Sequence, residues 1–160
     1  MRTDTRYGVG EAFQVMQDIV TFHATAEQSD DHLLVFQVDV GPGGGPPPLH
    51  THEAAEFFWT LKGNLSYFRQ DEDGEIVEIS GGAGTHAFIP SNVPHTYRNL
   101  SDEPAAYLGV LSPGRSMQDF LLEIARDVGS TPLSPEYVLG TGASFGVVTL
   151  DIVPGEQSRG

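Results

Sequence analysis

The chain is 160 residues long, 39% of them are hydrophobic, and 22 Asp and Glu residues against 8 Lys and Arg give a net charge of −14. This length suits a single domain, and the negative charge argues against binding to nucleic acid or to anionic membrane surfaces, both of which need clustered cations. The chain has no cysteine, which excludes disulfides and thiolate metal ligands, and it shows neither an apolar signal region nor a membrane-length apolar run, so we expect a cytoplasmic location.

Short runs typical of β-strands, separated by Gly, Pro, Asn and Asp, make up most of the chain. These runs are residues 18–26, 32–40, 56–61, 64–70, 75–80, 86–90, 95–99 and 105–112. Residues 41–48 (GPGGGPPP) cannot form a helix or a central strand and are expected to be a loop. Lys62-Gly63 is a tight connection that predicts a hairpin between its two flanking strands. Many short strands at this spacing predict an all-β fold, either a sandwich or a barrel.

One helix is predicted, over residues 116–128. Ser116 is placed to cap its first turn, apolar residues recur at helical spacing, and Gly129 follows as a stop. We expect the apolar stripe of this helix to pack against the sheet. Ser134-Pro135 is expected to open one short helical turn that ends by Gly140.

These elements predict a single domain that spans residues 1–160. The barrel core is expected over about residues 15–113, before the helix, and a tail over about residues 155–160 is expected to be mobile. The sequence has no internal repeat and no long low-complexity tract, so it gives no sign of a second domain.

Two histidines lie one residue apart at the start of a predicted strand. Side chains alternate between the two faces of a strand, so His50 and His52 point the same way. Glu56 begins the next strand and shares its face with Phe58 and Thr60, whereas Phe57, Trp59 and Leu61 take the other face. The two faces of this strand are therefore expected to have different roles.

A further histidine opens a later strand. Residues 90–94 (PSNVP) form a predicted turn, in which Asn92 tolerates a left-handed backbone, and His95 follows directly with Tyr97 on the same face. Two strand pairs would place four ligand-type side chains around one point inside a barrel, namely His50, His52, Glu56 and His95. Imidazole and carboxylate ligands suit Fe, Mn, Ni, Co, Cu or Zn and do not by themselves choose among these metals.

The spacing of these residues resembles the two sequence motifs of the cupin family. The first cupin motif, G-(x)5-H-x-H-(x)3–4-E-(x)6-G, is matched at Gly44, His50, His52, Glu56 and Gly63. The second, G-(x)5-P-x-G-(x)2-H-(x)3-N, is matched at Gly84, Pro90, His95 and Asn99, with Asn92 where the family usually has glycine. The resemblance covers roughly residues 10–115. Within the cupins, the chain resembles the small single-domain quercetin-dioxygenase-like proteins.

This resemblance implies a cupin β-barrel of the jelly-roll type with a short C-terminal helix, one bound divalent transition metal and a homodimer. The first hypothesis for its function is a metal-dependent dioxygenase that acts with O₂ on a small aromatic or enolic, flavonol-like molecule. The three histidines would hold the metal, and Glu56 would be a ligand, a general base or both. Phe58 and Tyr97 would shape the substrate pocket.

Two other functions use the same ligands. A non-redox cyclase or isomerase of a polyketide-like substrate would need the metal only as a Lewis acid, and oxygen consumption separates it from a dioxygenase. A non-catalytic cupin would bind a small molecule without turnover. For Tyr97, a packed core tyrosine bonded through its hydroxyl is an equal alternative to a pocket role.

The remaining histidines and the acidic and glycine clusters favour structural roles. We expect His86 at a structural or surface position, His23 exposed to solvent and His32 in a turn. Gly41–Gly45 lacks the helix start and the lysine of a phosphate-binding loop. Asp71–Asp73 is expected to be a solvated hairpin tip, and not a Ca²⁺ site.

Overall fold

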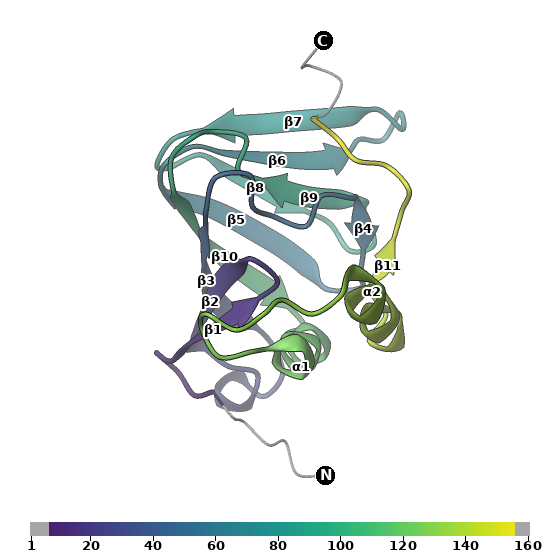
Figure 1. Cartoon of the computed structure of the whole chain (residues 1–160). Coiled ribbons are helices and arrows are strands. Elements are labelled where there is room, and N and C mark those ends of the chain that lie inside the picture. The colour runs from purple at the N-terminus through teal and green to yellow at the C-terminus, as the bar shows by residue number, and fades with distance from the viewer. Residues whose placement is uncertain (1–6, 156–160) are drawn as a thin grey trace.

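A computed structural model describes residues 7–155 of the chain, which form two antiparallel β-sheets and two short α-helices (Figure 1). The elements in chain order are β1 (Ala12–Val15), β2 (Asp18–Ala24), a 3₁₀ turn (Glu27–Ser29), β3 (Leu34–Val40), β4 (His50–Thr51), β5 (Ala55–Lys62), β6 (Leu65–Gln70), β7 (Ile76–Gly81), β8 (His86–Ile89), β9 (His95–Arg98), β10 (Ala105–Ser112), α1 (Arg115–Ile124), α2 (Pro135–Ser144) and β11 (Val148–Thr149). The prediction of an all-β fold with a C-terminal helix is confirmed. None of the described helices is long and apolar enough to cross a membrane.

The two sheets pack against each other, and their inner faces form the core. One sheet has the strand order β1-β2-β3-β10-β5-β8, and the other has the order β11-β4-β9-β6-β7. Strand β3 shows the pattern clearly, because every second residue is buried, namely Leu34, Phe36, Val38 and Val40. This alternation follows from the two-residue period of a strand, so one face of each strand supplies the core and the other faces outward.

Strands β5 and β6 belong to different sheets, so the hairpin predicted at Lys62-Gly63 is wrong. β5 pairs with β10 and β8, whereas β6 pairs with β7 and β9. Gly63 has φ of 70°, and a Cβ atom at this position would lie 2.5 Å from the carbonyl oxygen of Pro104. A residue with a side chain does not fit there, and the glycine instead lets the chain cross sharply from one sheet to the other.

Helix α1 ends four residues earlier than the predicted span of 116–128. Gly114 occupies the N-cap position, so Ser116 lies inside the helix and does not cap it. The helix stops at Ile124 because Arg126 forms a two-way backbone bridge with Gln14 of β1, with N–O distances of 2.7 and 2.9 Å. This pairing with a distant strand requires an extended backbone and outweighs the helical pattern of the sequence.

Helix α2 is ten residues long, whereas only one turn was predicted before Gly140. The predicted start is confirmed, because the Ser134 side chain accepts a hydrogen bond from the amide of Tyr137 at 3.2 Å. Gly142 of α2 lies close against Phe120 of α1, and a Cβ atom there would be 3.4 Å from its ring. Helix α2 lies between α1 and β11 at one corner of the molecule (Figure 1). Of the tail predicted over residues 155–160, only Gly155 belongs to the described residues.

The expected surface positions of three histidines and of the acidic turn are confirmed. His23, His32 and His86 are exposed, and the ring of His86 stacks on that of Trp59 with centroids 5.3 Å apart. The Asp71 carboxylate accepts hydrogen bonds from the Asp73 and Glu75 amides at 2.9 Å, at the tip of the β6–β7 hairpin.

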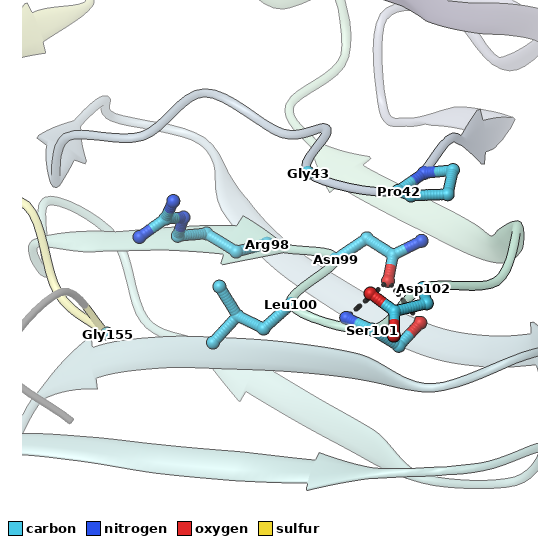
Figure 2. A pocket seen from close by; sticks show the side chains of 8 residues that line it. All are labelled: Pro42, Gly43, Arg98, Asn99, Leu100, Ser101, Asp102 and Gly155. Atoms are coloured by element: carbon cyan, nitrogen blue, oxygen red, sulfur yellow. Dashed lines mark hydrogen bonds between the residues drawn. The ribbon is translucent and has the colours of Figure 1, made fainter. Parts of the chain in front are cut away.

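A groove of about 550 Å³ opens beyond the C-terminal end of β9 (Figure 2). It lies between the loop that contains Pro42 and Gly43 and the turn formed by residues 99–102. None of the side chains predicted to bind metal or substrate lines this groove, since His95 lies at the opposite end of β9. The candidate site is therefore elsewhere.

Candidate metal centre

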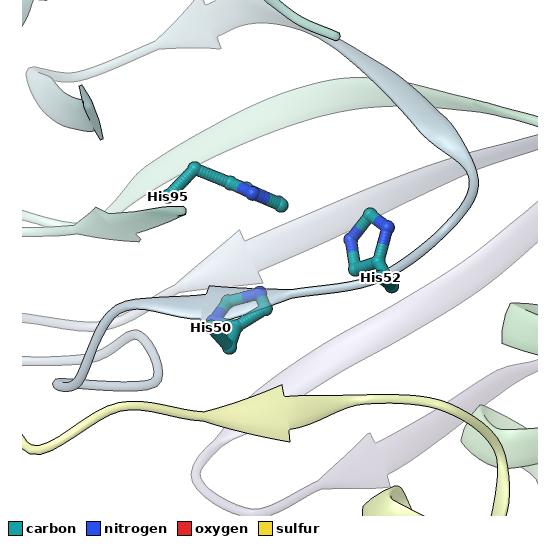
Figure 3. Close-up of side chains that lie close together, drawn as sticks. All are labelled: His50, His52 and His95. Atoms are coloured by element: carbon teal, nitrogen blue, oxygen red, sulfur yellow. The ribbon is translucent and has the colours of Figure 1, made fainter. Parts of the chain in front are cut away.

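Three of the predicted ligands come from two neighbouring strands of the five-stranded sheet. His50 begins β4, His52 follows directly after this strand, and His95 begins β9. His50 and His95 are paired in register across the two strands. The three imidazole rings gather around one space (Figure 3), and each offers a nitrogen atom that lies within 4.8 Å of the others. Three imidazole nitrogens at these separations fit the coordination of a single transition metal.

Glu56 reaches the same space from the facing sheet, near the start of β5. Its Oε2 atom lies 3.2 Å from Nε2 of His52 and 3.0 Å from Nε2 of His95. The side chain is buried, as is Phe58 two residues later, whereas Trp59 on the opposite face of β5 is 41% exposed. The alternation predicted for this strand is confirmed, and the structure brings Glu56 together with the histidines.

Backbone carbonyl groups hold the imidazole rings from behind. The Nδ1 atoms of His52 and His95 lie 2.8 Å from the carbonyl oxygens of Ala54 and Val93. Because only a protonated Nδ1 can donate to a carbonyl, these contacts place a proton on Nδ1 of each ring. Nε2 then faces Glu56, where it donates to the carboxylate when it is protonated and offers its lone pair to a metal ion when it is not. Metal-bound histidines are oriented in this way by their second ring nitrogen, so the two rings fit a metal ion.

The turn before β9 provides one of these carbonyl groups. Asn92 has φ of 61°, which confirms the predicted left-handed backbone at the position where the family motif has glycine. The amide of Asn92 donates to the carbonyl oxygen of His52 at 2.9 Å, and the next residue, Val93, provides the acceptor for His95. The turn therefore ties the two histidine segments together as well as orienting one ring.

The charges in the site depend on one another. Burial opposes the charge on Glu56, but hydrogen bonds from His52 and His95 outweigh it and hold the pKa of this carboxyl well below its usual range. Burial likewise opposes the charge on His52, but the Glu56 carboxylate raises the pKa of this imidazole. For His50, burial and the two neighbouring histidines lower the pKa to about 3, so its ring is neutral at physiological pH. A carboxylate that stays ionised beside a neutral imidazole suits a bound cation.

The two residues predicted to line the pocket have different positions. Phe58 is 1% exposed and lies with its ring centroid 6.2 Å from that of His95, so it forms an apolar inner wall next to the histidines. The Tyr97 hydroxyl instead donates to the Asp18 carboxylate at 2.6 Å. The alternative of a core tyrosine bonded through its hydroxyl therefore describes Tyr97 as the structure places it.

Asp18 is a buried carboxylate that the sequence interpretation did not single out. It begins β2, is 4% exposed, and its Oδ1 atom has no hydrogen-bond partner among residues 7–155. Burial raises its pKa to about 6, although the bond from Tyr97 and the amide of Gly45 act in the opposite direction. The sequence did contain a signal for this position. Val20 and Phe22 alternate on the inner face of β2, and the same period of two places Asp18 on that face.

Replacing Asp18 with asparagine is expected to remove one source of pH-dependent destabilisation. The folded-state pKa of about 6 lies above the ordinary value of 3.8, so the folded chain binds this proton more tightly than the unfolded chain does. The stabilisation of the folded state by this proton is thus complete below pH 3.8, and it is lost as the pH rises through 6. By this linkage, the free energy of unfolding of the wild type relative to Asp18→Asn should fall by about 3 kcal/mol between pH 3 and pH 8. Urea unfolding of both proteins at pH 3 and pH 8 measures this change. If the difference in free energy of unfolding between the wild type and Asp18→Asn is the same at both pH values, the raised pKa is contradicted.

A small cavity reaches the candidate metal centre at His52. A space of about 80 Å³ lies between His52–Ala54 and the C-terminal helices, where Met117 and Phe145 line it. Pockets for drug-sized ligands are on the order of 300–1,000 Å³. This cavity therefore has room for a molecule of only a few non-hydrogen atoms beside His52.

Comparison with known proteins agrees with this architecture. Residues 36–111 match the family described as Cupin domain. A search of curated proteins gave no match. Among solved structures, a mutant of Bacillus subtilis oxalate decarboxylase is similar with a TM-score of 0.56 and 23% identity, over 66% of this chain and 28% of that chain. An oxalate oxidase is similar with a TM-score of 0.52 and 22% identity, over 79% of this chain and 65% of that chain.

A third structure, described as DMSP lyases RdDddP and RnDddQII, has a TM-score of 0.50 and 21% identity, over 60% of this chain and 47% of that chain. This chain thus spans less than two thirds of the length of each of the three, and likeness at these identities shows the fold alone. The family match over residues 36–111, the similar fold and the spacing of the histidine and glutamate residues agree with one another, and this part of the chain is similar to a cupin domain.

Proposed function

We propose that this protein is a metal-dependent cupin enzyme, and specifically a dioxygenase that acts on a small enolic molecule. The observation that carries the proposal is the cluster of His50, His52 and His95, whose ring nitrogens converge within 4.8 Å and in two cases point their Nδ1 atoms at backbone carbonyls. A divalent metal bound there would supply Lewis acidity and, for Fe, Mn, Co, Ni or Cu, the means to react with O₂.

The protein side chains would then handle the proton and the solvent. Glu56 lies beside the space that the histidines enclose, so its carboxylate is placed to accept a proton from a substrate hydroxyl when a bound metal ion takes the two histidine nitrogens that now contact it. Phe58 and the buried aromatic rings behind it would exclude water from that space.

A non-redox lyase or isomerase is the second candidate. The observation that favours it is again Glu56, because a carboxylate base beside a Lewis-acid site is sufficient for proton abstraction without O₂. The related folds include proteins named as an oxidase, a decarboxylase and lyases, so the fold accommodates both kinds of chemistry. The third alternative, a cupin that only binds its ligand, uses the histidines but leaves Glu56 without a chemical role.

Metal analysis combined with oxygen uptake is the test of this proposal. Protein purified without added metal and then loaded separately with Fe²⁺, Mn²⁺, Co²⁺, Ni²⁺, Cu²⁺ or Zn²⁺ is expected to retain about one ion per chain. An oxygen electrode with a panel of small enols and 2-oxo acids should then show uptake with at least one redox-active metal and none with Zn²⁺. Turnover without oxygen uptake would instead identify the lyase or isomerase, and a folded protein that retains no metal would reject the proposal.

A further inference from the structure

Arg69 lies on the inner face of β6, directly beside a metal-site histidine. The antiparallel register pairs Arg69 with His95 of β9, and residues paired in this way project from the same face of the sheet about 5 Å apart at their Cβ atoms. Two residues earlier, Tyr67 is buried and its hydroxyl lies 2.6 Å from the Thr60 hydroxyl of the facing sheet. This face of β6 therefore points into the space between the sheets, so Arg69 stands at the end of the barrel that carries the histidines.

The side chain of Arg69 has no partner among residues 7–155. It forms no hydrogen bond and no ion pair there, and its Nε atom is buried and unsatisfied. Arg115, by contrast, is paired with Glu27 and Asp31, with N–O distances of 2.6 and 2.7 Å. Burying a guanidinium donor without an acceptor is costly, so an acceptor that comes from outside the chain would relieve this cost.

We propose that Arg69 binds the carboxylate of a small acidic substrate whose enol or keto oxygen faces the three histidines. This inference rests on the proposed function and adds the substrate class to it. The guanidinium group is planar, always charged and shaped to bind a carboxylate through two parallel hydrogen bonds. Since the chain carries a net charge of −14, an acidic substrate needs a local cation of this kind to enter the site. A short 2-oxo or enolic acid carries both groups, a carboxylate for Arg69 and an oxygen for the histidines beside it.

The test compares the binding of pyruvate with that of its neutral analogue, methyl pyruvate. Each is titrated under nitrogen into the Co²⁺-loaded protein, and binding is followed by the change in visible absorption of the bound Co²⁺. Arg69→Gln is expected to retain the same amount of Co²⁺ as the wild type but to bind pyruvate about 10- to 100-fold more weakly. Methyl pyruvate, which lacks the charge, should bind to both proteins equally. Arg69→Lys keeps the positive charge without the two-point geometry and should bind pyruvate with intermediate affinity.

Arg98→Gln is the matched control. Arg98 lies on the neighbouring strand and also has a buried, unsatisfied Nε atom, but it is on the opposite face, where it donates to the Pro154 carbonyl at 2.7 Å (Figure 2). This variant should bind pyruvate as the wild type does. Equal pyruvate affinity in the wild type and Arg69→Gln would overturn the role of Arg69 while leaving the metal site intact. If Arg69→Gln does not fold, Arg69→Lys provides the test, and wild-type pyruvate affinity in that variant would also overturn the role of Arg69. A wild-type protein that retains no Co²⁺ would overturn the proposed function and this inference with it.

Discussion

Replacing His95 with alanine is expected to abolish metal retention and to leave the barrel folded. His95 is the histidine at the centre of the site, since it is paired with His50 on the next strand and bonded to Glu56 across the sheets. Loss of an outer residue that merely orients a metal ligand typically costs about 10- to 100-fold in affinity, so the loss of the ligand itself should cost more. Elemental analysis after gel filtration measures the metal retained, and His52→Ala should behave in the same way.

The folded state should survive this change because packing between two sheets supports it. His95 is 1% exposed, and its removal leaves the Glu56 carboxylate with one hydrogen bond fewer, a cost of about 1–3 kcal/mol. Typical domains have about 5–15 kcal/mol of stability. His86→Ala is the matched control, because His86 is an exposed histidine outside the site and should retain the full amount of metal. A circular dichroism spectrum of an unfolded chain for His95→Ala would make the metal structural, and full metal retention would show that the ligands are wrong.

Replacing Glu56 with glutamine is expected to reduce turnover by about 10²–10⁴-fold while most of the metal stays bound. Glutamine keeps the shape of the side chain and one oxygen atom, but it cannot accept a proton at neutral pH. The three histidines still supply the nitrogen ligands, so metal content should fall little. Steady-state rates per bound metal ion measure the effect, and Glu75→Gln, at an exposed position in the β6–β7 turn, is the control.

Three outcomes separate the possible roles of Glu56. A large loss of rate with the metal retained supports a proton acceptor. A parallel loss of metal and rate, both restored by excess metal, supports a ligand only. A variant with full metal and full activity would contradict both roles and would leave the three histidines as the working site.

The positions of the candidate metal ligands were largely predictable from the sequence because the patterns that mark them are local. The spacing of His50, His52 and Glu56 reflects side-chain alternation on two short strands, and the backbone of Asn92 is decided by the turn in which it lies. Strand faces follow from the same period of two, as the burial of Phe58 shows. Each of these features depends on residues only a few positions away.

The features that were missed depend on contacts between distant segments. Lys62-Gly63 has the composition of a hairpin turn. The pairing of the strands on either side of it, however, depends on where they lie in the two sheets of the complete fold. The end of α1 is decided by Gln14, more than a hundred residues earlier. Arg69 has the appearance of a solvated strand residue until the register places it beside His95. None of this information is present in the neighbourhood of the residue concerned.

The candidate ligands are divided between the two halves of the sandwich, and this division has a mechanical consequence. The histidines belong to one sheet, whereas Glu56 belongs to the other. A filled site would act as a non-covalent cross-link, comparable to a disulfide in a chain that has no cysteine. Separation of the sheets would then have to break coordination as well as packing, so the residues that carry the chemistry would also raise the barrier to opening the barrel.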